Sequence, residues 1–154
     1  MTGRVVWMHG DGLSVTDPAL HAHPDAPAVF VFDRPFLRGT PVAFPRLAFM
    51  YQGVRDVAAH RPGLTEVRVG GVAEELAAFA ARHAATELHV TRNFTPDFAR
   101  IVDDLRAACP EVRVVIHEPE RLTGYAGPLR RFFGFWKKVE REVLHGDAPA
   151  RGHR

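Results

Sequence analysis

Two short polar segments carry the residues best suited to hold a ligand. Each follows an apolar run and combines charged, amide, aromatic or glycine residues within a few positions. An arginine presents a planar fork of donors, an aspartate accepts hydrogen bonds, and glycine lets a ligand approach the backbone closely. This chemistry predicts a binding site without catalytic residues. The candidate ligand-binding residues are His9, Gly10, Asp11, Gly12, Arg92, Asn93 and Phe94.

Asp11 and Arg92 form the centre of this predicted site, and two interpretations of them stay open. They can bind a ligand from both segments, or pair with each other in a salt bridge that joins the segments. Trp7 and Phe94 present a similar choice, between stacking on a flat cofactor and packing in the core. Asp33 ends a predicted strand where nucleotide-binding domains often hold a ribose, but the first turn has no GxGxxG motif.

The nine histidines of the chain raise the question of a metal site. His21 and His23 lie close to Asp25 in a proline-rich segment. No cysteine or second histidine pair stands nearby to complete a zinc-type ligand set, so we expect surface histidines and no metal site. The chain also lacks the GxSxG turn of serine hydrolases and the phosphate-binding loop of nucleotide triphosphatases.

The segments that must position these residues alternate between strands and helices. Apolar runs rich in β-branched and aromatic residues predict strands, and apolar residues at three- and four-residue spacing predict helices. The predicted strands are 5–8, 28–33, 65–70, 87–91 and 112–117. The predicted helices are a short one capped by Asp17 and Pro18, then 44–60, 72–84, 96–109 and 129–144. Residues 34–41 are expected to form a loop.

This alternation predicts an α/β fold, a Rossmann-like three-layer αβα domain with a five-stranded parallel sheet covered on both faces. With the first strand in the centre, the predicted order is 3-2-1-4-5, and the order reverses between strands one and four. Ligands bind outside the carboxyl ends of the strands at such a reversal. The two polar segments follow strands one and four, so the fold would bring them to one site.

The first polar segment and its flanks resemble the amino-terminal α/β domain of the DNA photolyase and cryptochrome family. That family begins with a strand ending in Trp-Phe, continues with Arg-Arg-Asp-Leu-Arg and reaches Asn-Pro-Ala-Leu. The matching residues here are Trp7, Asp11, Pro18, Ala19 and Leu20. The departures are His9 and Gly10 in place of the paired arginines, Leu13 in place of the third, and Asp17 in place of the asparagine.

The resemblance continues along nearly the whole chain. After the fourth strand the family carries Asn-Arg-Asp, an aromatic residue and Glu-Pro, followed by a helix with Arg and Asp. The matching residues here are Arg92, Phe94, Pro96, Arg100 and Asp103, while Asn93 and Thr95 replace acidic residues. Residues 46–50 resemble the family helix between strands two and three, and Tyr125 with 133–138 resembles the stretch that leads out of the domain.

The resemblance implies a domain that carries no chemistry of its own. In many family members this domain helps to hold an antenna-type chromophore, a folate or a deazaflavin or flavin. FAD belongs to a helical domain that follows it in the family, so we expect no tight FAD binding and no deoxyribodipyrimidine photo-lyase activity from this domain alone. Two alternatives stay open: the amino-terminal half of a split photolyase, and a small nucleotide-binding α/β enzyme.

The predicted carboxy-terminal helix is the candidate interaction surface. Its apolar residues recur at three- and four-residue spacing and include several aromatic rings, whose exposure to water is unfavourable. We expect self-association or a helical partner chain, FAD-binding if the resemblance holds, with folding back onto the sheet as the alternative. The predicted interface residues are Leu129, Phe132, Phe133, Phe135, Trp136 and Val139.

Composition sets the broad limits. The chain has 154 residues, 46% of them hydrophobic, which is enough for one domain with a substantial core. The predicted organisation is an α/β domain over 1–127, the helix over 128–146 and a disordered tail over 147–154. A single cysteine, no signal peptide and no membrane-length apolar run predict a cytoplasmic protein, with Cys109 as an inert packing residue. A net charge of +2 leaves nucleic-acid binding open.

Overall fold

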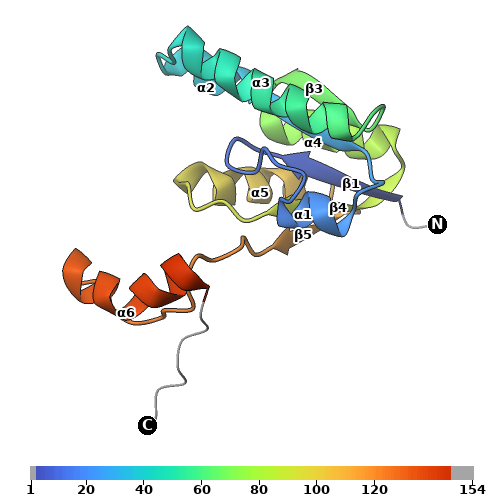
Figure 1. The fold of residues 1–154 in the computed structure, drawn as a ribbon. Helices are drawn as coiled ribbons and strands as arrows, with labels where there is room; N and C mark the ends of the chain where they lie inside the picture. Colours follow the sequence, from blue (N-terminus) through green and yellow to red (C-terminus); the bar gives the residue numbers. More distant parts are fainter. Residues whose placement is uncertain (1–2, 147–154) are drawn as a thin grey trace. The chain divides into compact units, whose positions relative to one another are not determined.

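A computed structural model describes residues 3–146 of the chain. The chain divides into two compact units, Met1–Pro119 and Glu120–Arg154. The first unit carries the alternating strands and helices, and the second carries the final helix (Figure 1). The first unit therefore ends earlier than the α/β domain predicted over residues 1–127.

Strands and helices alternate through the first unit. The strands are β1 (Gly3–Met8), β2 (Ala28–Asp33), β3 (Thr65–Gly70), β4 (Ala85–Thr91) and β5 (Arg113–His117). The helices are α1 (Pro18–Ala22), α2 (Arg34–Gly39), α3 (Phe44–His60), α4 (Val72–Arg82) and α5 (Pro96–Ala108). The predicted positions of all five strands and of four of these helices are confirmed.

The strands form one parallel sheet in the order β3-β2-β1-β4-β5, which confirms the predicted topology. β1 lies in the centre, where Val6 is opposite Ala28 of β2 and Val5 is opposite Leu88 of β4. A central parallel strand is buried on both faces, which explains why residues 5–8 are uniformly apolar. The sheet order reverses at β1, so the loops after β1 and β4 lie at the same edge of the sheet.

Two apolar clusters hold the layers together, one on each face of the sheet. On one face, side chains of β1, β2 and β4 pack against α4 and α5, with Leu76 and Phe79 fully buried. On the other face, Val6, Met8 and Phe30 pack against α1 and α3. Burying each large apolar side chain contributes roughly 2 kcal/mol, so these clusters fix the sheet on which the site depends.

The segment 34–41, predicted to be a loop, contains the short helix α2, and that prediction was wrong. The Asp33 carboxylate accepts a hydrogen bond from the backbone N–H of Phe36 at 3.2 Å, and Pro35 lies in the first turn of the helix. An aspartate cap followed by proline is the same signal that starts α1 at Asp17 and Pro18. The signal is weak in this segment because no apolar stripe accompanies it.

The second unit contains α6 (Phe132–His145), which begins later than the predicted residue 129. The Glu142 side chain of α6 accepts hydrogen bonds from the Thr123 hydroxyl and the Gly124 N–H, both at 2.6 Å. The ring of Tyr125 packs edge-on against Phe135 at 5.4 Å between centroids. These contacts give residues 120–146 a local structure of their own.

Two further predictions concern the ends of the chain and membranes. The disordered tail predicted over residues 147–154 lies outside the described residues. Between residues 3 and 146, none of the helices has both the length and the apolar character that crossing a bilayer would need.

Candidate functional site

A cavity of about 480 Å³ opens at the carboxyl edge of the sheet in the first unit. Its floor comes from the ends of β1 and β2, and its walls come from α2, the segment 40–43 and the first turns of α3 and α5. The sheet positions this cavity because parallel strands end together and the helices that follow them diverge there. The apolar and aromatic lining residues include Trp7, Phe30, Phe32, Phe36, Leu37, Leu47, Met50, Phe98 and Ile101.

A small set of polar residues lines the same cavity. His9 and Asn93 come from the two predicted polar segments, and Asp33, Arg46 and Asp97 come from the ends of β2, α3 and α5. The combination of a mostly apolar wall with a few polar groups is the usual composition of a small-molecule site. This composition suits a mostly apolar ligand with a few polar groups.

The structure places the predicted site residues in two groups. His9, Gly10 and Asn93 line the cavity. The remaining predicted residues are close in sequence to these lining residues but do not line the cavity themselves. They are Asp11, Gly12, Arg92 and Phe94.

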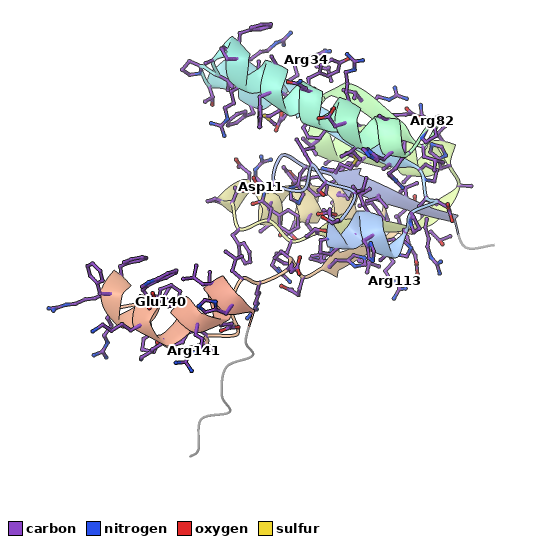
Figure 2. All side chains as sticks on the ribbon, in the orientation of Figure 1. Asp11, Arg34, Arg82, Arg113, Glu140 and Arg141 are labelled. Carbon is purple, nitrogen blue, oxygen red and sulfur yellow. The ribbon has the colours of Figure 1, made fainter. Side chains whose placement is uncertain are left out.

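Arg92 and Asp11 do not pair with each other, which excludes the interpretation that they form a salt bridge between the two segments. The guanidinium of Arg92 instead pairs with the carboxylate of Glu118, with 2.7 Å between Nε and Oε1. Asp11 lies exposed in the loop between β1 and α1 (Figure 2). Gly12 lies beside Asp17, where an added Cβ would come within 2.5 Å of the capping carboxylate. Close packing against Asp17 therefore explains the glycine at this position.

Trp7 and Phe94, paired in the prediction, have different environments. Trp7 is buried and stacks on Phe98 with 5.6 Å between ring centroids and 17° between planes, while the exposed ring of Phe94 is 80% accessible. The imidazole of His9 stands edge-on to both Trp7 and Phe98 and hydrogen-bonds the carbonyl of Thr91 at 2.7 Å. Trp7 and Phe98 thus form a rigid aromatic wall of the cavity.

A second polar cluster lies away from this cavity, on the face of the sheet that α1 covers. One imidazole nitrogen from each of His23, His89 and His117 lies within 4.8 Å of the others. Burial lowers the pKa of His89 to about 4, and the neighbouring His23 adds to that effect. Burial and the nearby His117 also lower the pKa of His23. The imidazoles of His23 and His89 therefore favour their neutral form.

Glu87 completes this cluster. Its carboxylate binds Arg113, Arg4 and His89, and the hydrogen bond from Arg113, followed by those from the other two, lowers its pKa to about 2. Sequence reasoning grouped His23 with His21 and Asp25 and missed its true neighbours. The available signal was the pair His89 and His117, which lie at nearby positions of adjacent predicted strands.

A family model supplies the decisive comparison. The model of the DNA photolyase family matches residues 4–152 of the chain. The chain belongs to the DNA photolyase family. The resemblance predicted from the motifs around Trp7 and Arg92 is thereby confirmed, along with the α/β fold that it implied.

Solved structures of photolyase-family proteins share the fold. The cryptochrome of Synechocystis sp. matches with a TM-score of 0.71 and 15% identity over 93% of this chain and 35% of that one. The archaeal photolyase of Sulfolobus tokodaii, solved with two FAD molecules and implicating a novel light-harvesting cofactor, matches with a TM-score of 0.59 and 15% identity over 90% of this chain and 35% of that one. The chain spans about a third of the length of these proteins. No curated protein matches the sequence.

Proposed function

We propose that the first unit is a ligand-binding domain whose cavity holds a flat aromatic chromophore of the antenna type, a folate or a deazaflavin or flavin. The single observation that carries this proposal is the cavity of about 480 Å³ at the carboxyl edge of the sheet. Its volume falls within the roughly 300–1,000 Å³ of typical small-molecule sites. The domain performs no catalysis in this proposal, as the family resemblance implies.

The aromatic wall supports a flat ligand. The rings of Trp7 and Phe98 stack on each other and are 5% and 6% exposed, so a bound ring would contact their small accessible part without a further loss of side-chain entropy. Phe36 on α2 is 46% exposed and also lines the cavity, where a bound ring would cover it. A tricyclic or bicyclic ring in the cavity would exclude water from these side chains.

Polar groups at the rim support a ligand with hydrogen-bonding edges. Asn93 and Arg46 offer donors, and Asp33 and Asp97 offer acceptors. Pteridine and isoalloxazine rings carry both kinds of group. The two FAD molecules of the Sulfolobus tokodaii photolyase give a precedent for cofactors in that relative.

Binding is tested by titrating the untagged chain with FMN, FAD, a deazaflavin and methenyltetrahydrofolate and following ligand absorbance and fluorescence. Ala43→Trp should weaken binding at least about tenfold, a change of about 1.4 kcal/mol, because its ring would enter the cavity. Ala43 is exposed and makes no side-chain cap to α3, so the fold should tolerate the change. Ala59→Trp, at the exposed far end of α3, is the matched control.

Arg46→Ala is a second variant, with Arg55→Ala on the same helix as its control, since both arginines are exposed and only Arg46 lines the cavity. If none of the four compounds binds with a Kd below about 100 μM, or if Ala43→Trp and Ala59→Trp bind equally well, the chromophore proposal is wrong. Binding of FAD alone would favour a flavin nucleotide in place of a folate.

We further propose that α6 is a docking element for a second copy of the chain or for a helical partner chain. The supporting observation is the exposure of apolar residues in the second unit. Leu129, Phe132 and Phe133 are 73%, 66% and 75% exposed. Val139 is 1% exposed, so it is not part of the proposed contact surface, which is narrower than the predicted interface.

A further inference from the structure

Three histidines from three distant parts of the first unit converge on one point. His23 follows the last residue of α1, His89 lies within β4, and His117 ends β5. The ring centroids of His23 and His89 are 3.9 Å apart, and those of His89 and His117 are 5.2 Å apart. None of the three lines the cavity described above. Their convergence therefore needs an explanation apart from the chromophore proposal.

The sheet register explains why His89 and His117 meet. β4 and β5 are parallel neighbours, and His117 is opposite Thr91, two residues beyond His89 and on the same face. The Nδ1 atom of His89 lies 2.9 Å from the Nε2 atom of His117. α1 packs against β4 and β5, and His23 at its C-terminal end lies next to the other two histidines. The three rings are thus held by backbone elements and not by one flexible loop.

Glu87 determines which nitrogen of His89 faces the cluster. The Nε2 atom of His89 lies 3.2 Å from a Glu87 carboxylate oxygen, and Arg4 and Arg113 hold that carboxylate in place. A carboxylate accepts, so Nε2 carries the proton and Nδ1 presents its lone pair toward His117 and His23. A carboxylate behind an imidazole is a recurring arrangement at metal sites, because it fixes the tautomer and raises the basicity of the ligand nitrogen.

We propose that His23, His89 and His117 form a binding site for a divalent transition-metal ion, with Zn²⁺ as the ion that these donors fit. Three imidazoles without a thiolate suit zinc, copper, nickel or cobalt, whereas magnesium and calcium require oxygen ligands. His89 is 4% exposed, and His23 and His117 are half-buried, so the site is closed on the sheet side and open toward solvent. A water molecule can complete a tetrahedron from that open side.

The observed spacing is close to what zinc requires. Zn–N bonds of 2.0–2.1 Å at tetrahedral angles place ligand nitrogens roughly 3.3 Å apart. The nitrogen pair of His89 and His117 must open slightly from 2.9 Å, and the widest pair must close from up to 4.8 Å. His117 ends its strand and His23 follows its helix, so side-chain rotations can supply these shifts. His117 then carries its proton on Nδ1.

The alternative is a ladder of hydrogen bonds, in which His117 donates to His89, His89 donates to Glu87, and no metal binds. Calorimetry decides between the two with the untagged full chain, stripped of metal and titrated with ZnCl₂. The expected result is one bound equivalent in the unmodified chain. Loading with Co²⁺ should give the intense visible absorption of a four-coordinate ion. Absence of both signals in the unmodified chain would overturn the proposal.

Three substitutions and one control locate the site. His23→Ala and His117→Ala each remove a ligand from a half-buried position, so both variants should fold and bind Zn²⁺ about 100-fold more weakly or not at all. Glu87→Gln should weaken binding about 10–100-fold, because it removes the carboxylate behind His89. His21→Ala is the matched control, since His21 is exposed and two residues from His23.

Melting temperatures supply a readout that is independent of calorimetry. Zn²⁺ binds only the folded site, so it should raise the melting temperature of the unmodified chain and of His21→Ala but not of His117→Ala. Melting of each variant in EDTA reports whether it folds. If His117→Ala folds and retains full Zn²⁺ affinity, the ion binds elsewhere and the proposal is wrong. If a variant fails to fold, the stoichiometry and Co²⁺ spectrum of the unmodified chain still decide the question.

Discussion

At the scale of single residues, Arg61 is the side chain that fixes the loop after α1. Its guanidinium is buried and donates hydrogen bonds to the carbonyls of His23, Pro24 and Ala26 at 3.1, 3.0 and 2.6 Å. Burial lowers the pKa of Arg61, and the nearby Asp25 carboxylate partly opposes that effect. A guanidinium retains its charge in proteins, so the three carbonyls gain charge-assisted bonds.

Arg61→Met is therefore expected to lower the free energy of unfolding by about 2–4 kcal/mol, because three carbonyls lose their charged donor. Urea unfolding followed by circular dichroism measures this difference. Arg55→Met, an exposed position on the same helix, should change stability by less than about 0.5 kcal/mol. Equal effects of the two substitutions would show that the loop does not depend on the guanidinium.

The environment of Cys109 lowers the reactivity of its thiol. The side chain is 3% exposed, and its thiol donates to the carbonyl of Leu105 at 3.1 Å. Burial, followed by the nearby Glu111 carboxylate, raises the pKa of the thiol. These observations confirm the prediction of a packing residue.

Alkylation of Cys109 should be slow in the folded chain, because a raised pKa leaves little thiolate at pH 8. Iodoacetamide labelling followed by mass spectrometry should give a rate at least about tenfold below that of the chain unfolded in urea. A labelling rate equal to that of the unfolded chain would contradict the burial of this thiol.

At the scale of elements, α1 is a helix that cannot form alone. It has five residues, and isolated helices shorter than about 12 residues are marginal in water. The Asp17 carboxylate accepts from the N–H groups of Ala19 and Leu20 at 3.1 and 3.3 Å, and the Thr91 hydroxyl bonds both Asp17 and the Ala19 N–H. α1 is therefore stabilised by a cap that β4 completes.

Asp17→Ala is expected to destabilise the first unit by about 1–2 kcal/mol, at the upper end for a helix cap, because the buried Thr91 hydroxyl also loses its acceptor. Asp17→Asn retains an acceptor oxygen and should lose less than half of that amount. Thermal unfolding of both variants in parallel gives the comparison. If the asparagine variant is as unstable as the alanine variant, the charge matters more than the hydrogen bonds.

The sequence contains most of the fold and only part of the site. Continuous or alternating apolar patterns and their glycine and proline boundaries determine the strands, so β2 and β3 begin and end at the predicted residues. The cavity at the carboxyl edge of the sheet was harder to predict, because α2 supplies one wall and the only signal for α2 is a capping aspartate followed by proline, without an apolar stripe. His23, His89 and His117 are separated by many residues, and only the sheet order and the placement of α1 bring them together.

At the scale of the whole molecule, the chain combines an α/β unit with a second unit that exposes aromatic rings. Phe132 stacks on Trp136 at 6.0 Å, which gives the exposed rings of α6 a defined arrangement. An exposed apolar surface on a helix is a common feature of protein contact sites. This exposed surface is the basis of the docking role proposed for α6.

If α6 mediates self-association, the full chain should sediment as a dimer or larger species at micromolar concentration, and Phe133→Glu should sediment as a monomer. Phe133 suits this test better than the half-buried Trp136, because its exposed ring can be replaced without disturbing the unit. Arg141→Glu, an exposed charge reversal on the same helix, is the control. A monomeric unmodified chain would leave the helical partner chain as the remaining proposal for α6.

The pairing of β1 with β4 has a consequence for synthesis of the chain on the ribosome. β1 is synthesised before β4, and Val5 pairs with Leu88. One edge of the central strand therefore stays unpaired until about 80 further residues have been synthesised. At 5–20 residues per second this wait lasts roughly 4–16 s. During that interval β1, β2 and β3 can assemble with an unpaired apolar edge, which is where chaperones or a neighbouring nascent chain would bind. Synonymous codons that slow translation between β3 and β4 should therefore lower the yield of native protein.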